Sequence, residues 1–118
     1  MRYNPLKTKS LAFAIRIVNL YKYLCTKQEY VMSKQILRCG TSIGANVSEA
    51  QRGQSTPDFA SKMYVALKEA EETEYWLTLL HETDYIDDEE TKSIMDDCEE
   101  LIKLLVATTK TVNNRENE

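Results

Sequence analysis

The sequence has few of the residues that break helices or build covalent frameworks. Only three glycines and two prolines occur among 118 residues, which leaves few positions for the tight turns of a β-rich fold. The cysteines Cys25, Cys39 and Cys98 are odd in number, widely spaced and without a C-x-x-C pair. Such cysteines form neither a disulfide framework nor a zinc site, and they are typical of reduced, buried thiols in the cytoplasm.

Long apolar segments are missing as well. Residues 1–10 contain no apolar core of a signal peptide, and the longest apolar run, residues 11–20, is interrupted by Arg16 and Asn19. That run is far shorter than the roughly 20 residues that are needed to cross a bilayer. We therefore expect a cytoplasmic protein without a membrane partner.

No group of residues indicates catalysis or metal binding. The single histidine, His81, follows Thr78 by three residues, so the Glu-x-x-His pairs of di-iron bundles are missing. An acidic run on the same segment comprises Glu69, Glu71, Glu72 and Glu74. No serine or cysteine near His81 has the context of a nucleophile. We predict no enzyme activity, catalytic residue, metal, cofactor or small-molecule substrate.

Charge is divided unevenly along the chain. Residues 1–62 hold ten Lys and Arg against three Asp and Glu, a net charge of +7. Residues 63–118 hold five against sixteen, a net charge of −11, so the whole chain carries −4. The acidic total argues against a free-standing nucleic-acid binder, and the fold decides whether the two halves form separate faces or neutralise each other.

Apolar residues recur at intervals of three and four in four segments, which predicts four amphipathic helices in one domain spanning residues 1–118. The helices are expected near residues 6–26, 33–52, 57–83 and 88–112. The inward positions include Leu6, Phe13, Ile17, Ile36, Ile43, Val47, Phe59, Met63, Ala66, Ala70, Thr73, Leu77, Ile94, Cys98, Leu101, Leu105, Thr108 and Val112. Short connections and a repeat near 3.5 predict an all-α, antiparallel up-down-up-down left-handed four-helix bundle.

Local signals mark three of the helix ends. Thr56 before Pro57 predicts the N-cap of the third helix, because proline is favoured in the first helical turn. Asp87 with Glu90 three residues later has the form of a capping box at the start of the fourth helix. Gly53 is expected to stop the second helix.

Two glycines lie inside the second helix, where each lowers helix propensity by about 1 kcal/mol relative to alanine. Gly40 and Gly44 are four residues apart and share one face. We interpret them as a site where another helix approaches closely, and the alternative is a small-residue floor for a ligand.

A polar stripe follows the same helix through Gln35, Arg38, Ser42, Asn46 and Glu49. Such a stripe is either a solvated face or a polar seam that hydrogen-bonds to another helix or subunit. The sequence leaves both readings open.

More apolar side chains are present than one narrow core can bury. We expect the excess to form an interface between subunits, since exposed aromatic and apolar patches usually mark one. A wide apolar core is the alternative. The candidate oligomer interface comprises Leu11, Ile15, Val18, Gly40, Gly44, Tyr64, Leu67, Tyr75 and Trp76.

The segments 35–38, 41–50 and 66–77, together with Phe59, resemble a known family. They are similar to the bacterial four-helix-bundle proteins encoded by intervening sequences within 23S ribosomal RNA genes, which are often called ribosomal-protein-like. The resemblance implies a homopentameric ring without established enzymatic activity. Relatives include the accessory protein of diversity-generating retroelements, which is basic and binds nucleic acid and a reverse transcriptase.

Two functions therefore compete. The first is a homo-oligomeric interaction scaffold, in which the basic half of one subunit faces the acidic half of the next. The alternative is an RNA- or DNA-binding accessory protein that uses a basic face of the first two helices. The candidate nucleic-acid contacts are Arg2, Lys7, Lys9, Arg16, Lys22, Lys27, Lys34 and Arg38.

Overall fold

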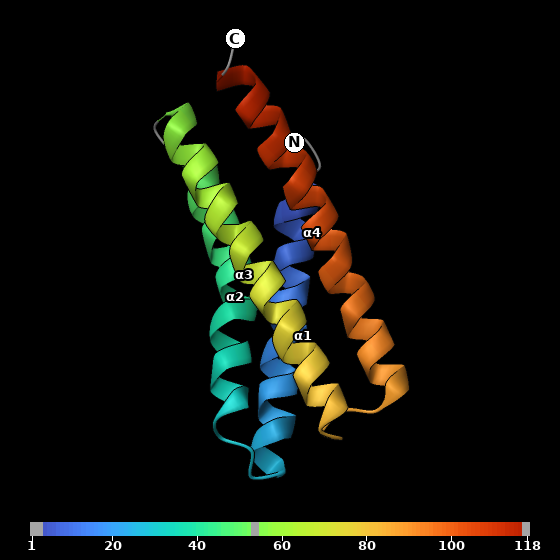
Figure 1. Cartoon of the computed structure of the whole chain (residues 1–118). Coiled ribbons are helices and arrows are strands. Elements are labelled where there is room, and N and C mark those ends of the chain that lie inside the picture. Colours follow the sequence, from blue (N-terminus) through green and yellow to red (C-terminus); the bar gives the residue numbers. More distant parts are fainter. Residues whose placement is uncertain (1–3, 53–54, 117–118) are drawn as a thin grey trace.

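The computed structural model describes residues 4–52 and 55–116, and these form four helices and no strand (Figure 1). The helices are α1 (Pro5–Thr26), α2 (Met32–Gln51), α3 (Thr56–Glu82) and α4 (Asp88–Glu116). Helices that are adjacent in sequence pack together, and α1 also touches α4. The diagonal pairs α1–α3 and α2–α4 make no close backbone contact within the described residues. The predicted four-helix bundle is confirmed.

The buried positions follow the predicted intervals in all four helices, with a few differences. Ser10 is buried in the gap that the apolar pattern left between Leu6 and Phe13. Thr109 is buried instead of Thr108, because a step of four follows Leu105 where a step of three was expected. Phe59 was also predicted to face inward and is only half-buried, although it still packs against the core.

The start of α3 differs from the prediction by one residue. The Oγ atom of Ser55 accepts a hydrogen bond from the backbone nitrogen of Asp58 at 3.2 Å, so Ser55 is the N-cap. Thr56 was predicted for that role and instead forms the first helical residue before Pro57. Gly53, the predicted stop of α2, lies outside the described residues, and α2 ends at Gln51.

The start of α4 forms one half of the predicted capping box. Oδ1 of Asp87 accepts a hydrogen bond from the backbone nitrogen of Glu90 at 2.8 Å. The Glu90 carboxylate does not return to Asp87 but pairs with Arg16 of α1. The helix continues to Glu116, past the predicted end at residue 112.

Gly40 and Gly44 allow close contact between α2 and α1 of the same chain. A Cβ atom on Gly40 would lie 2.7 Å from Cγ1 of Ile17, a distance that real contacts do not reach. A Cβ atom on Gly44 would lie 3.3 Å from the backbone oxygen of Ser10. The close-packing interpretation is therefore correct, but Gly40 is buried by its own chain and offers no surface to a second subunit.

Candidate functional site

The segments that carry the family resemblance lie on α2 and α3 and meet where these two helices pack together. Arg38 of α2 pairs with Glu69, at 3.1 Å between Nη1 and Oε2, and also with Glu72. The indole nitrogen of Trp76 donates a hydrogen bond at 3.0 Å to Oε2 of Glu72, which is also the atom that Arg38 contacts. Four residues from two helices thus form one network, which fixes the orientation of Trp76.

Trp76 is half-buried and packs against the core of its own chain, as does Leu67. These two residues fit the wide-core alternative, because much of their apolar surface is already used within the subunit. Sequence analysis placed both at an interface because helical periodicity sets them off the central row. Periodicity gives the direction in which a side chain leaves the helix, but not how far a large side chain reaches back toward the core.

Four residues of the predicted polar seam find partners within the subunit. The Ser42 hydroxyl donates to the backbone oxygen of Arg38 at 2.6 Å, and the Asn46 amide donates to the backbone oxygen of Ser42 at 2.8 Å. Glu49 pairs with Lys62 of α3 at 2.8 Å. Its charged members therefore join α2 to α3, and its neutral members bond to their own helix.

One strongly exposed apolar surface remains on α3. Tyr64 and Tyr75 are eleven residues apart, which places them on the same side of the helix, and 59% of Tyr75 is exposed. The Tyr75 ring contacts the edge of Trp76, with ring centroids 5.3 Å apart and planes at 76°. We call Tyr64 and Tyr75 the α3 patch.

A second apolar surface lies on α1. Leu11 is 63% exposed and Ile15 is 56% exposed, while Val18, one turn further on, is half-buried. We call these three residues the α1 patch. α1 and α3 are diagonal in the bundle, so the α1 patch and the α3 patch lie on helices whose described residues make no close backbone contact with each other.

Several predicted nucleic-acid contacts are occupied by acids of the same chain. Nζ of Lys9 lies 2.7 Å from Glu100, and Arg16 pairs with Asp97 at 2.8 Å and with Glu90 at 3.3 Å. Arg38 is held by the glutamates of α3, as described above. The basic and acidic halves of the sequence therefore neutralise each other along the bundle, within one subunit.

The other predicted contacts differ among themselves. Lys7, Lys22 and Lys34 are exposed. Nζ of Lys27 lies over the ring of Tyr23, 5.6 Å from its centroid. Arg2 lies outside the described residues.

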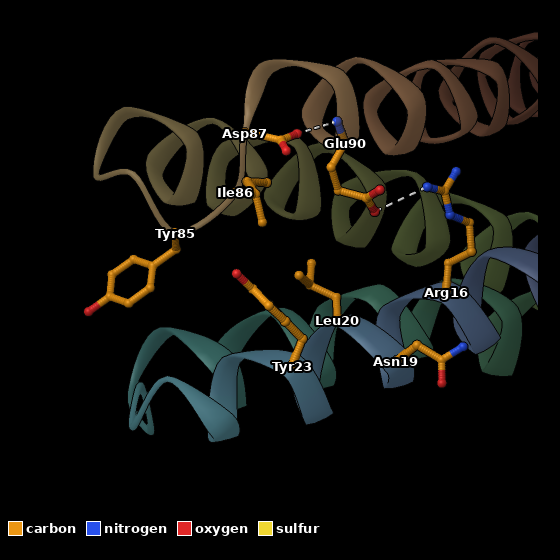
Figure 2. Close-up of a pocket in the computed structure, with 8 residues that line it drawn as sticks. All are labelled: Arg16, Asn19, Leu20, Tyr23, Tyr85, Ile86, Asp87 and Glu90. Carbon is orange, nitrogen blue, oxygen red and sulfur yellow. Dashed lines mark hydrogen bonds and ion pairs between the residues drawn. The ribbon is translucent and has the colours of Figure 1, made fainter.

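A groove that sequence analysis missed separates α1 from the α3–α4 connection. Its volume is about 500 Å³, and its lining is Arg16, Asn19, Leu20, Tyr23, Tyr85, Ile86, Asp87 and Glu90. Figure 2 shows Tyr85 at one end, Arg16 and Asn19 at the other, and Leu20 and Ile86 between them. No sequence motif predicts this groove, because it forms where the α3–α4 connection lies beside α1, which is distant in sequence.

Two of the three cysteine thiols are poorly suited to reaction. Burial raises the pKa of Cys39 to about 11 and that of Cys98 to about 12, so both stay protonated at neutral pH. The Cys39 sulfur also accepts a hydrogen bond from the hydroxyl of Thr73 at 3.2 Å. Among the described residues, no group of three or more His, Cys, Asp and Glu side chains is placed to hold a metal ion.

Comparison with known proteins finds the family that the sequence resembles. The family model described as 23S rRNA-intervening sequence protein matches residues 4–107. The chain belongs to this family. A crystal structure from Bacteroides thetaiotaomicron VPI-5482, of a protein with unknown function from the S23 ribosomal protein family, is similar in sequence and fold. It is 58% identical, with a TM-score of 0.88 over 89% of this chain and 98% of that one.

The comparison with curated proteins found no match. Within the described part of this 23S rRNA-intervening sequence protein, no helix is both long and apolar enough to cross a membrane.

Proposed function

We propose that the protein is a non-enzymatic cytoplasmic scaffold whose subunits assemble into a closed ring. In this ring the α1 patch of one subunit packs against the α3 patch of the next. The observation that carries the proposal is the exposure of Leu11, Ile15 and Tyr75, each of which leaves more than half of its surface in water. Apolar patches of this kind on a water-exposed face usually mark an interface.

The placement of the patches supports a ring over a two-fold dimer. A two-fold contact uses the same surface on both partners, whereas head-to-tail contacts join two different surfaces and close into rings. The α1 patch and the α3 patch are different surfaces on diagonal helices. The resemblance noted in the sequence implies five subunits, and we propose that number here.

The ring does not need the charge halves of neighbouring subunits to attract each other. The basic residues Lys9, Arg16 and Arg38 already pair with acids of their own chain. Apolar contact is then the main attraction between subunits, and assembly should depend only weakly on salt.

The test is the mass of the assembly in solution, measured by light scattering. Ile15→Glu and Tyr75→Glu should each dissociate the ring, because either change removes one half of every contact between its subunits. Val106→Glu is the matched control, since Val106 is an exposed apolar residue of α4 outside both patches.

Mixing the two variants distinguishes a ring from a two-fold dimer. The Ile15→Glu chain keeps an intact α3 patch and the Tyr75→Glu chain keeps an intact α1 patch, so the two variants should bind each other in equal numbers when they are mixed. A wild-type protein that stays monomeric at micromolar concentration would show the proposal to be wrong. A mixture in which the two variants do not bind each other would also show it to be wrong.

Nucleic-acid binding is the second candidate function. The exposed side chains of Lys7, Lys22 and Lys34 favour it. The ion pairs of Lys9, Arg16 and Arg38 weaken it, since their charges already face carboxylates.

A further inference from the structure

At the end of the bundle that holds the α1–α2 and α3–α4 connections, exposed basic and acidic residues do not pair as they do along the helices. Both connections lie at the same end, opposite the chain termini (Figure 1). Lys22, Lys27 and Lys34 are exposed at the first connection, and Glu82, Asp84, Asp87, Asp88 and Glu89 are exposed at the second. Within the described residues no ion pair joins the two groups, although basic and acidic helices pair elsewhere along the bundle. Glu82 and Asp88 lie near His81, but the lysines and the acids described at this end do not pair with each other, so complementary charge remains available there.

The α1–α2 connection also holds two large apolar side chains in water. Val31 is 73% exposed and Tyr30 is 53% exposed. Val31 occupies the N-cap position of α2, where its side chain makes no capping hydrogen bond. Serine, threonine, aspartate and asparagine are favoured at that position, and valine is among the worst residues there. The carboxylate of Glu29 caps the helix instead, because it accepts hydrogen bonds from the backbone nitrogens of Val31 and Ser33, so the exposed Val31 side chain has no role in the helix start.

A groove that could hold such side chains lies beside the acidic connection. The groove between α1 and this connection has an apolar floor of Leu20 and Ile86, and Tyr23 and Tyr85 contribute aromatic surface (Figure 2). Its volume of about 500 Å³ is within the range of sites that enclose small ligands or side chains. The carboxylate of Asp87 lies on its border.

We propose that this end is a self-association site at which two copies meet end to end about a two-fold axis. Tyr30 and Val31 of each copy enter the groove of the other copy. The lysines of each α1–α2 connection then face the acidic α3–α4 connection of the partner. A two-fold contact forms this match twice, because each copy both offers the apolar tip and receives one.

The proposed end contact is independent of the side contacts of a ring. If the ring forms, the end contact joins two rings. If the ring does not form, it joins two single chains. In either case the wild-type particle holds twice as many chains as a variant that has lost the end contact, so failure of one proposal is distinguishable from failure of the other.

Val31→Ser tests the contact without weakening the fold. Glu29 already caps α2 and the Val31 side chain is exposed, so the melting temperature should stay the same. The mass measured by light scattering should nevertheless fall to half of the wild-type value. Val106→Ser, which removes an exposed valine from the side of α4, should leave the mass unchanged. A Val31→Ser protein with wild-type mass would overturn the proposal.

Charge reversal gives a second test. Lys34→Glu places an acid in the first turn of α2 and Glu82→Lys places a base in the last turn of α3, and both changes suit the helix dipole. Lys34→Glu lowers the summed charge of the three lysine positions from +3 to +1, and Glu82→Lys changes that of the five acidic positions from −5 to −3. Each variant weakens the attraction between the two connections, so its mass at a given salt concentration should fall below that of the wild type, and the double variant should dissociate most readily. Variants whose mass matches that of the wild type at every salt concentration would refute the end contact.

Discussion

The carboxylate of Glu29 lies 2.7 Å from the backbone nitrogen of Ser33 and accepts its hydrogen bond. The other oxygen of the same carboxylate accepts from the backbone nitrogen of Val31 at 3.2 Å. Glu29 is buried, and it performs the capping that the side chain of Val31 does not perform. A residue that precedes the helix thus satisfies two of the backbone donors at the start of α2.

Glu29→Ala should lower the free energy of unfolding by about 1–2 kcal/mol, the upper range for the loss of an N-cap. Glu29→Gln keeps one acceptor oxygen and should cost less. Chemical denaturation measures both, and Glu71→Ala, at an exposed position of α3, serves as the control. A Glu29→Ala protein as stable as the control would contradict the capping role.

Gly40→Ala should destabilise the protein although alanine is the better helix former. The new Cβ atom would lie 2.7 Å and 2.8 Å from Cγ1 and Cγ2 of Ile17, whose side chain is fully buried and cannot swing into solvent. Overpacking typically costs about 1–3 kcal/mol, which exceeds the gain in helix propensity of about 1 kcal/mol. Thermal unfolding measures the change. Ala45→Gly, on the exposed side of α2, calibrates the propensity alone, and a stabilised Gly40→Ala protein would contradict the close contact.

His81 should make stability depend on pH near neutrality. Its Nε2 atom lies 2.6 Å from Oδ1 of Asp88, and this hydrogen bond is the main reason why the pKa of His81 is raised above the usual 6.5. A raised pKa stabilises the folded state below the unfolded value, and this contribution is lost as pH rises through the folded value. His81→Gln should therefore be less stable than the wild type in mildly acidic buffer and equal to it at alkaline pH.

Denaturant titrations from about pH 5 to about pH 9 measure this difference, within the range where histidine titrates. Asp88→Asn should remove most of it, because the main cause of the raised pKa is then missing. A His81→Gln protein that differs from the wild type by the same amount at every pH would show that the histidine acts only by packing.

Nucleic acid should bind weakly and only at low salt. The free lysines at positions 7, 22 and 34 attract phosphates, but the acids of α3 and α4 repel them, and three of the predicted contacts already have acidic partners. We expect dissociation constants of roughly 10⁻⁴–10⁻⁶ M, the non-specific range. Titrations of structured RNA and duplex DNA at several salt concentrations test this. Nanomolar binding at physiological salt that Lys7→Glu and Lys22→Glu abolish would place nucleic-acid binding first.

The helices were predictable because the periodicity of apolar residues is a repeated signal, supported independently by Asp87 at the start of α4. The prediction was less accurate where one residue decides a boundary. Ser55 and Thr56 are both good N-caps, so sequence alone does not choose between them. Thr108 and Thr109 are equally suited to a core position, and only the packing of α4 on its neighbours selects Thr109.

The surfaces were predictable in part. Leu11, Ile15 and Tyr75 are exposed as the pattern indicated. The burial of Trp76 was not predictable, because it depends on an acceptor, Glu72, that is itself held by a residue of another helix. The groove was not predictable either, because Tyr85 and Tyr23 line it together only after the bundle forms.

The contact between α1 and α4 is the least extensive of the four contacts between neighbouring helices, and its charged residues form ion pairs on the surface. These are also the first and last helices of the chain, so parting them breaks no connection. In a hydrogen-exchange experiment, backbone amides of α1 and α4 along their mutual contact should lose protection before those of α2, which is covered on two sides by more extensive contacts. The bundle therefore has a built-in order of local opening, in which the α2–α3 hairpin is the last element to exchange its amide protons with solvent.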